Sequence, residues 1–371
     1  MKIQKLEIKG FKSIAHVLFE NCSPFLVFAG ANGAGKSNLV DALVFLSVVV
    51  ERGAFQAIRQ FGGFNQIHCF KFRKEQRTTM SFALKINIEN VLYEYSLKIR
   101  SLNQSPELEE TLKINNNVVV DRKAHGDTLI CMTEGNPLQK LPDYPNEKSA
   151  LMLLAKNPLY GFLTNVRVFR IDPFAAKEPD TSTTDASTLD AQGKNIATIL
   201  SILEKEDNFR SQILEWIELI VPGMESVSTE KQRLDSSTVI TFKEEGTKTR
   251  FPAKLVSDGT ICALCILTAV LSRAKSIGIT IIEEPERGIH PKAISELVSL
   301  MRQNASTKHP VFITTHSESV VRGLETEELY FVSKSDGKTQ VKSALTAHVD
   351  KKLIPLDTAW LTNLFDGGLP W

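Results

Sequence analysis

One segment constrains the fold of this chain more than any other: FLVFAGANGAGKSNLV, residues 25–40. Its second half, Gly30 to Ser37, fits the pattern G-x-x-x-x-G-K-[ST], in which glycines let backbone N–H groups approach phosphate oxygens closely. The apolar run before this loop predicts a buried strand, and the apolar spacing after it predicts a helix. The N-terminus of that helix favours an anion. The segment therefore predicts an α/β fold that binds a nucleoside triphosphate.

We expect particular roles for the residues of this loop. Lys36 should reach the β- and γ-phosphates of ATP and act in catalysis, and the Ser37 hydroxyl should be a ligand of Mg²⁺. The residues expected to contact ATP are Gly30, Asn32, Gly33, Ala34, Gly35, Lys36, Ser37 and Asn38. ATP and Mg²⁺ are therefore the predicted cofactors.

Two carboxylates stand at the end of another apolar run, in GITIIEEPERGIHP, residues 278–291. Ligands of open α/β sheets bind beyond the carboxyl ends of the strands. Glu283 is therefore the predicted Mg²⁺ ligand, and Glu284 the residue that orients or deprotonates the attacking water. In isolation the pair would indicate only two solvated glutamates that open a turn before Pro285, but the phosphate loop upstream favours a site.

A third strand end carries a histidine. The segment PVFITTHSES, residues 310–319, places Thr314, Thr315 and His316 after an apolar run. His316 is the third polar group expected at the same sheet edge. We predict that it senses or polarises the γ-phosphate or the attacking water.

The segment KLVSDGTICALCILTAVL, residues 254–271, admits two interpretations. Ser257, Asp258 and Gly259 precede a predicted helix, so they can form a second anion-binding site at its N-terminus. Ser257 or Asp258 can equally be an ordinary N-cap, which satisfies a free backbone N–H of the helix.

Composition narrows the class of protein. Of the 371 residues, 42% are hydrophobic, enough for a sizeable core, and 44 basic residues balance 43 acidic ones, so the whole chain has no general attraction for nucleic acid or membranes. Five scattered cysteines indicate a reducing compartment, and the C-x-x-C of Cys262 and Cys265 lies in an apolar run typical of small core residues. No apolar run approaches the roughly 18 residues of a membrane span, and residues 1–14 alternate like a strand rather than a signal peptide. We therefore expect a cytoplasmic protein with no membrane contact.

Apolar periodicity predicts the remaining elements. Strands are expected over 2–14, 25–30, 164–172, 278–284, 310–316 and 328–334, with antiparallel hairpins over 78–100, 112–136 and 236–256. Helical segments are expected over 36–51, 147–163, 196–220, 260–275 and 292–305, and from residue 317 onward. Residues 174–192 are polar and predict a surface loop. The alternation of strands and helices in the second half predicts a parallel sheet.

Together these motifs resemble the ABC-type ATPase heads of the SMC, RecF and OLD-like proteins. GANGAGKSN, LVSDGT, IIEEPERGIHP and ITTHS occur in the order and approximate spacing of that family, as do GFKSI near the start, LDAQGKNIATIL before the second motif and the tail TAWLTNLFDGGLPW. The resemblance implies a phosphate-loop core with a mixed, mainly parallel sheet, an antiparallel β lobe and a helical lobe that carries the signature motif. The implied division is an N-terminal half of the head at 1–100, an inserted β/helical lobe at 101–250 and a C-terminal half at 251–371.

The resemblance also implies roles in trans. LVSDGT corresponds to the signature motif, so Ser257, Asp258 and Gly259 are expected to contact the γ-phosphate of ATP bound to a second copy, and the loop 288–290 is expected to cross the interface. The glutamine that senses Mg²⁺ in this family is left open between Gln60 and Gln66. Glu283 stands where the family usually has aspartate, and the long coiled coil of SMC proteins is absent from the sequence.

The implied function is a compact ATPase that forms a homodimer or a higher even-numbered oligomer on binding ATP. With no nuclease module expected after residue 334, we predict that it regulates a separate effector such as a nuclease or toxin, in prokaryotic anti-phage defence. The alternative is a RecF- or SMC-like ATPase of DNA repair or recombination, with residues 71–77, Arg167 and Arg170 as candidate DNA contacts. A transporter ATPase is disfavoured, because nothing indicates a membrane partner. Residues 100–180 could dock a partner or merely extend the head.

Overall fold

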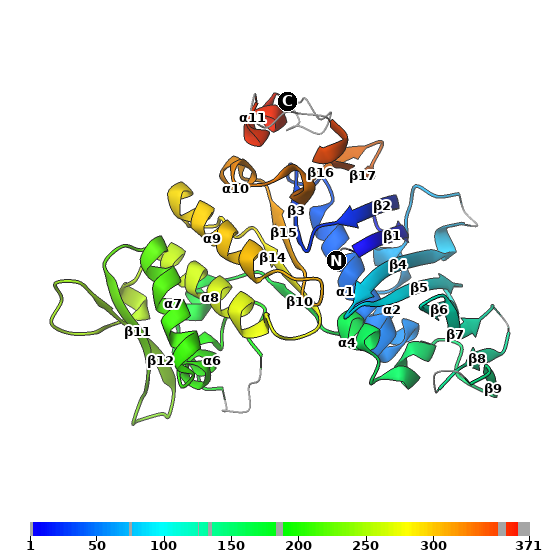
Figure 1. Ribbon diagram of the computed structural model, residues 1–371, viewed down its shortest axis with the longest axis horizontal. Helices are drawn as coiled ribbons and strands as arrows, with labels where there is room; N and C mark the ends of the chain where they lie inside the picture. Colours follow the sequence, from blue (N-terminus) through cyan, green and yellow to red (C-terminus); the bar gives the residue numbers. More distant parts are fainter. Residues whose placement is uncertain are drawn as a thin grey trace.

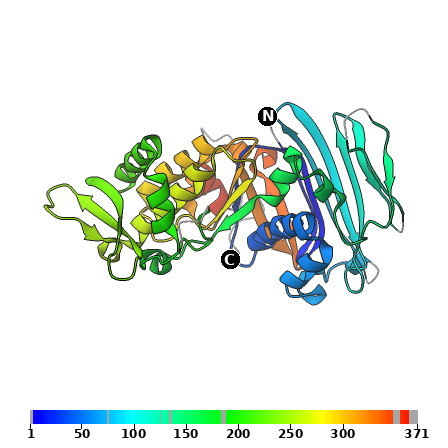
Figure 2. The ribbon, with the colours of Figure 1, turned by 90° about the horizontal axis from the view of Figure 1, so that it is seen from below.

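The computed structural model describes residues 3–73, 76–124, 126–132, 136–182, 188–347 and 354–362. These residues form three β-sheets, of eight, six and three strands. The six-stranded sheet lies in the middle, with the eight-stranded sheet on one side and a region of helices with the three-stranded sheet on the other (Figure 1, Figure 2). Parts of the expected loop (183–187) and of the expected tail (363–371) lie outside the described residues.

The six-stranded sheet combines segments from the whole length of the chain. In spatial order its strands are β10 (Val166–Phe169), β14 (Ile279–Glu283), β15 (Val311–Thr315), β3 (Phe25–Ala29), β16 (Leu329–Ser335) and β17 (Lys338–Ser343). The first five run parallel, and β17 pairs antiparallel with β16. Every residue of β3 and β15 is buried, which explains their continuous apolar runs. The predicted parallel sheet is confirmed, and β17 is a strand that we did not predict.

Both faces of this sheet are covered by helices or by the other sheet. Side chains of β3 alternate between two cores: Leu26 and Phe28 belong to one, and Val27 and Ala29 to the other. The first core includes side chains of α1, and the second includes α8 and α9. The helices of this central region are α1 (Lys36–Arg52), α8 (Asp258–Arg273), α9 (Pro291–Asn304), α10 (Glu318–Arg322) and α11 (Leu356–Leu361).

The eight-stranded sheet is antiparallel throughout. Its strands, in spatial order, are β2 (Ile14–Cys22), β1 (Ile3–Phe11), β4 (Met80–Ile88), β5 (Val91–Arg100), β6 (Glu107–Ile114), β7 (Asn117–Arg122), β8 (Thr128–Ile130) and β9 (Gln139–Leu141). The hairpin expected over 78–100 is confirmed, with Glu89 and Asn90 at positive φ in its turn. The boundary at residue 100 falls between the paired strands β5 and β6. The division of the chain at residues 100 and 250 stays a prediction.

The segment predicted as helical over 147–163 is divided in two. A 3₁₀ helix at Ala150–Leu154 precedes α4 (Pro158–Thr164). Pro158 disfavours the helical conformation at the residue before it, Asn157, so one continuous helix cannot run through this position. The side chain of Asn157 then caps the new helix by accepting a hydrogen bond from the N–H of Leu159 at 2.9 Å.

The helical region beside the central sheet differs from expectation in two places. Its elements are α5 (Pro173–Lys177), α6 (Ile196–Leu203), α7 (Asp207–Ile220), β11 (Met224–Lys231), β12 (Thr238–Glu244) and β13 (Phe251–Pro252). Helix α5 lies in the segment predicted as a loop, where Asp172 caps the N–H of Phe174. Strand β12 pairs mainly with β11. The sequence did not predict β11, because most of the residues of that strand are polar.

Among the described residues, none of the helices combines the length and apolar character needed to cross a membrane.

A buried polar cluster ties α8 to the far end of the central sheet. His309 is 0% exposed; its Nε2 lies 2.6 Å from Thr280 Oγ1 and its Nδ1 lies 3.1 Å from the carbonyl oxygen of Ser276. Arg273 Nε also donates to Thr280 Oγ1, at 2.9 Å. A neutral imidazole that donates from Nδ1 and accepts at Nε2 satisfies this arrangement. Burial, together with the charge of Arg273, lowers the pKa of His309 to about 4.

We predict that the free energy of unfolding falls as the pH decreases from about 6.5 to about 4, because the unfolded chain then binds a proton at His309 that the folded protein excludes. The full contribution is about 3 kcal/mol. Urea unfolding of the wild type and of His309→Gln across this range measures it, since other titrating groups cancel in the difference. The stability advantage of the wild type should shrink as the pH falls; an advantage that stays constant from pH 7 to pH 4 would contradict the prediction.

Candidate functional site

The register of the central sheet brings the predicted site segments to one edge. Glu283 of β14 pairs with Thr314 of β15, and Thr315 pairs with Ala29 of β3. The three strands run parallel, so their carboxyl ends lie at the same edge of the sheet. Along this edge the acidic residues after β14 come first, then His316 after β15, then the phosphate loop after β3.

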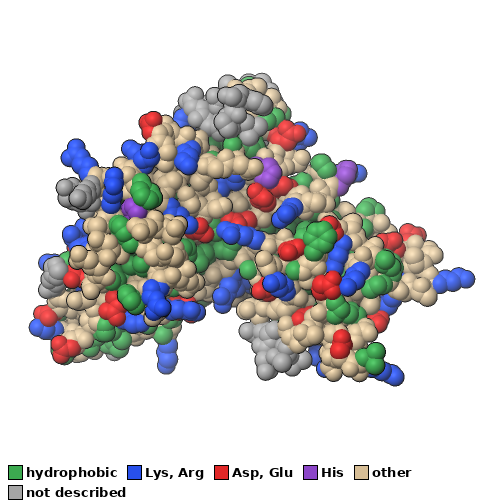
Figure 3. Space-filling view, turned by 180° about the vertical axis from the view of Figure 1, so that it is seen from behind, with side chains coloured by type: hydrophobic (Ala, Val, Ile, Leu, Met, Phe, Trp, Pro, Cys, Tyr) green, Lys and Arg blue, Asp and Glu red, His purple; other side chains and the backbone are tan. Residues whose placement is uncertain are grey.

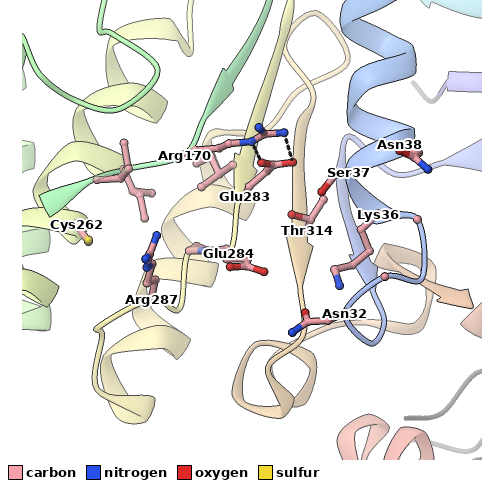
Figure 4. A pocket seen from close by; sticks show the side chains of 16 residues that line it. Asn32, Lys36, Ser37, Asn38, Arg170, Cys262, Glu283, Glu284, Arg287 and Thr314 are labelled. Atoms are coloured by element: carbon pink, nitrogen blue, oxygen red, sulfur yellow. Dashed lines mark hydrogen bonds and ion pairs between the residues drawn. The ribbon is translucent and has the colours of Figure 1, made fainter. Parts of the chain in front are cut away.

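A cavity of about 400 Å³ opens at this edge (Figure 4). Its walls come from the phosphate loop and the start of α1, from the turn after β14, from the residues after β10 and from α8. The lining residues are Asn32, Gly33, Gly35, Lys36, Ser37, Asn38, Arg170, Ile171, Cys262, Ile266, Ile282, Glu283, Glu284, Pro285, Arg287 and Thr314. Of the residues predicted in the phosphate loop and at the strand ends, Gly30, Ala34 and His316 do not line this cavity.

The phosphate loop needs glycine where it turns into α1. Gly35 has φ 110°, and a β-carbon there would lie 2.1 Å from Thr339 Oγ1. Lys36 follows it and donates from Nζ to the carbonyl oxygens of Gly30 at 2.7 Å and Ala31 at 3.0 Å. Burial lowers the pKa of the Lys36 ammonium below its usual value, and the Glu284 and Glu286 carboxylates oppose this shift. An anion in the cavity would relieve the cost of keeping this ammonium out of water.

Glu283 and Glu284 are held in different ways. Both carboxylate oxygens of Glu283 accept hydrogen bonds from the guanidinium of Arg170, from Nε and, at 3.2 Å, from Nη2. Glu284 has φ 50°, an uncommon conformation for a residue other than glycine, and its N–H donates to the carbonyl oxygen of Thr314 at 2.8 Å. Its side chain points into the cavity, between Arg287 and the phosphate loop (Figure 4).

His316 connects Glu284 to a third acid, Glu286. Nδ1 of His316 lies 3.2 Å from Glu284 Oε1, and its backbone N–H donates to Glu286 Oε1 at 3.2 Å. Glu286 Oε1 also accepts from the hydroxyl of Thr315 at 2.7 Å, while its buried Oε2 has no hydrogen-bond partner among the described residues. We did not predict Glu286 or Arg287, although both lie in the acidic turn that we singled out.

The signature residues lie outside the cavity of their own chain. Ser257 Oγ accepts from the N–H of Thr260 at 3.1 Å, so the N-cap interpretation is confirmed. Asp258 pairs with Lys177 of α5. Gly259 packs against the loop after β14, where a β-carbon would lie 2.1 Å from the carbonyl oxygen of Gly288.

Neither candidate for the Mg²⁺-sensing glutamine reaches the cavity. Gln60 belongs to α2 (Ala54–Gln60) and Gln66 to α3 (Phe64–Ile67), and neither residue lines the cavity wall. The helix α3 instead lies against the start of the chain, where Lys12 N–H donates to the carbonyl oxygen of Ile67 at 2.8 Å. The position beside Glu283 is held by Arg170.

The donors at the cavity fit a magnesium ion bound together with phosphates. Among the described residues, no group of three or more histidine, cysteine, aspartate or glutamate side chains forms a metal centre by itself. Ser37 and Glu283 both line the cavity. Mg²⁺ is commonly bound by one or two carboxylates plus substrate phosphates rather than by an all-protein cage.

A family model described as "AAA domain, putative AbiEii toxin, Type IV TA system" matches residues 25–322. This match includes the phosphate loop, the signature residues, the acidic strand and His316. Among curated proteins, the chain is 52% identical over 44 residues to the chromosome partition protein Smc of Halothermothrix orenii and 42% identical over 59 residues to that of Pyrococcus furiosus. These matches cover 12% and 15% of this chain but only 4% and 5% of the relatives, which are much longer proteins.

Solved structures of SMC heads share the fold. A head bound to the C-terminal winged-helix domain of ScpA has a TM-score of 0.59 at 16% identity, covering 92% of this chain and 97% of that one. The head domain from Thermotoga maritima has a TM-score of 0.51 at 15% identity, covering 92% and 99%. A head from Pyrococcus furiosus bound to the C-terminal domain of ScpA has a TM-score of 0.53 at 16% identity, covering 93% and 97%. The predicted fold class is thus confirmed, because the chain shares the fold of SMC heads, and the chain belongs to the matched AAA family.

Proposed function

We propose that this chain binds ATP with Mg²⁺ and hydrolyses it to ADP and phosphate. One observation supports this above all: a single cavity joins the phosphate loop after β3 to the carboxylates after β14. The loop offers the backbone N–H groups and the lysine that phosphates require. The opposite wall offers one carboxylate for a metal and another for an attacking water.

In this proposal the loop and the start of α1 bind and orient the phosphates. The Lys36 ammonium leaves the carbonyl oxygens of Gly30 and Ala31, to which it now donates, and pairs with the β- and γ-phosphates. Ser37 and Glu283 hold Mg²⁺, which when bound neutralises charge on the phosphate oxygens. Asn32 and Asn38 line the same wall and can donate to the nucleotide from their amides.

Glu284 is the proposed general base. Its backbone lies in the left-handed region, and the contact of its carboxylate with His316 Nδ1 at 3.2 Å orients the half-exposed side chain at the cavity. Glu286 is a positioning residue, because it holds the backbone of His316 and the hydroxyl of Thr315. His316 can then polarise the attacking water together with Glu284.

We further propose that two copies of the chain complete each other's sites. Ser257 is exposed and Gly259 is fixed against the loop after β14, while neither contacts its own cavity. Leu255, two residues before Ser257, is 74% exposed and would be covered by the second copy in such an assembly. Ser257, Asp258 and Gly259 would close the γ-phosphate side of the cavity in the other copy.

The proposed role is the ATP-dependent regulation of an effector in prokaryotic anti-phage defence. The description of the matched family names a type IV toxin–antitoxin system, which supports this context. Some SMC heads similar in fold were solved bound to ScpA, so binding a separate protein on such a head has a precedent. We place this protein in the cytoplasm, in keeping with its few, scattered cysteines, all five of which are buried.

A DNA-binding role of the RecF or SMC type has less support. Arg170, one of its candidate contacts, lines the cavity and is already paired with Glu283. On the outer face of the eight-stranded sheet, Lys85 pairs with Glu94, and Lys98 and Arg100 pair with Glu109. Figure 3 shows basic and acidic side chains interspersed over one face of the molecule. Mixed charge of this kind gives little attraction for a phosphate backbone.

We expect Glu284→Gln to leave Mg²⁺-dependent ATP binding within about twofold of the wild type while kcat falls about 10²- to 10⁴-fold, because the amide cannot accept a proton. Fluorescent-nucleotide titration and phosphate release measure the two quantities. Glu215→Gln, an exposed change on α7, is the matched control and should alter neither. Hydrolysis at the wild-type rate in Glu284→Gln would show that another residue is the base.

The shared site predicts rescue between two inactive variants. Lys36→Ala keeps Ser257 but lacks the loop lysine, whereas Ser257→Arg keeps the loop but blocks the signature, so a mixed dimer contains one intact site. An equimolar mixture should recover about a quarter of the wild-type hydrolysis, since half of the dimers are mixed and each has one of two sites. Each variant alone should be inactive while Ser257→Arg still binds ATP. If the two variants exchange subunits but recover nothing, the signature does not act in trans.

The proposed regulation of an effector predicts that a partner protein is encoded beside this chain. A neighbouring nuclease or toxin should co-purify with the chain when both are produced together, and Lys36→Ala should change the amount bound, because ATP controls the assembly. Quantitative co-purification with and without ATP and Mg²⁺ measures this. A partner bound equally by the wild type and by Lys36→Ala would contradict regulation through this site.

A further inference from the structure

Arg170 is a charged residue of the cavity wall whose contacts the proposed function does not explain. It follows β10, which pairs in parallel with β14 so that Phe169 lies opposite Ile282. The next residues along the two strands, Arg170 and Glu283, are therefore placed side by side. The guanidinium donates hydrogen bonds to both carboxylate oxygens of Glu283 (Figure 4). Its Nη2 also lies 3.9 Å from Asp41 Oδ1 on α1.

The two members of this ion pair differ in their freedom to move. The side chain of Glu283 is 10% exposed, because it belongs to a buried strand, whereas the side chain of Arg170 is 55% exposed. The carboxylate is thus fixed in the wall, and the guanidinium can swing into the cavity without unfolding the sheet. A bidentate guanidinium uses the carboxylate oxygens that a metal ion would otherwise bind.

The charges around the cavity make the pair sensitive to what binds. Lys36, Arg170 and Arg287 line it together with the carboxylates of Glu283 and Glu284. A divalent cation placed on Glu283 would lie beside the guanidinium and repel it. Among the described residues, Arg170 contacts one other carboxylate, that of Asp41, and Lys12 already pairs with Asp41 at 2.6 Å. A metal ion by itself therefore leaves Arg170 without an equally good partner.

We propose that Arg170 holds Glu283 in place of Mg²⁺ when the site is empty, and that it moves to the phosphates when Mg²⁺ and nucleotide bind together. This inference rests on the proposed ATPase function and adds a control to it. The phosphates give Arg170 the anionic partner that a metal ion alone does not provide. Binding of the metal and of the nucleotide is consequently coupled, and each strengthens the other.

The test measures binding of Mn²⁺ alone by electron paramagnetic resonance, without nucleotide. Arg170→Gln removes the competing cation, so we expect it to bind Mn²⁺ at least about tenfold more tightly than the wild type. The double variant Arg170→Gln/Glu283→Gln should lose this gain, which locates the metal on Glu283. Arg167→Gln, an exposed arginine on the same strand that does not line the cavity, is the matched control and should bind Mn²⁺ as the wild type does. An unchanged or weaker affinity in Arg170→Gln overturns the inference.

A second measurement separates exchange from a purely structural role. With Mg²⁺ present, Arg170→Gln should bind a fluorescent ATP analogue about fivefold or more weakly than the wild type, because a phosphate contact is lost. Tighter metal and weaker nucleotide binding in one variant is a pattern that general loosening of the fold does not produce. Arg170→Lys keeps the positive charge but loses the bidentate geometry of the guanidinium. Its Mn²⁺ affinity should therefore lie between those of the wild type and Arg170→Gln, and it serves as the test if Arg170→Gln does not fold.

The outcomes also distinguish this inference from the proposed function. If the wild type hydrolyses ATP but Arg170→Gln leaves Mn²⁺ affinity unchanged, only the exchange is wrong. If the wild type binds no nucleotide with Mg²⁺ present, the ATPase proposal fails, and the exchange fails with it.

Discussion

The parallel pairing of β3, β15, β14 and β10 is the constraint on which the rest of the molecule depends. These four strands come from residues 25–29, 311–315, 279–283 and 166–169, yet their carboxyl ends meet at one edge. A parallel sheet must be covered on both faces, since its strands are apolar on both sides. Helix α1 and the eight-stranded sheet provide one cover, and α8 and α9 provide the other. The cavity is what remains open where the covered strands end.

The close backbone contact between Gly259 and Gly288 gives this arrangement a mechanical consequence. Gly259 stands in the first turn of α8, and Gly288 stands in the loop that follows the acidic strand. Because no side chain separates the two segments, the loop after β14 cannot shift toward α8 without displacing the first turn of that helix. In the proposed assembly, the same contact would connect the Glu284 side of one site with the signature that faces the other.

Lys36, Glu283 and Glu284 each have a partner within the chain when no ligand is bound. Lys36 is bonded to carbonyl oxygens of its own loop, Glu283 is bonded to Arg170, and Glu284 lies beside His316. Phosphates and a divalent cation would replace several of these contacts at once. This is the physical basis for expecting nucleotide and metal to bind together and for the movement proposed for Arg170.

The amino-acid sequence by itself determined the strand–loop–helix unit around Lys36, the parallel core and the acidic strand end, because each depends on the spacing of apolar residues and glycines over a few positions. It also indicated the N-cap at Ser257. Strands β11 and β17 escaped prediction, since they are polar and obtain their hydrogen bonds from neighbouring strands. Only the tertiary structure decided that Arg170, rather than Gln60 or Gln66, stands beside Glu283, and that Glu286 supports His316. Those contacts depend on the register between β10 and β14 and on the packing of turns far apart in the chain, which no local pattern of residues encodes.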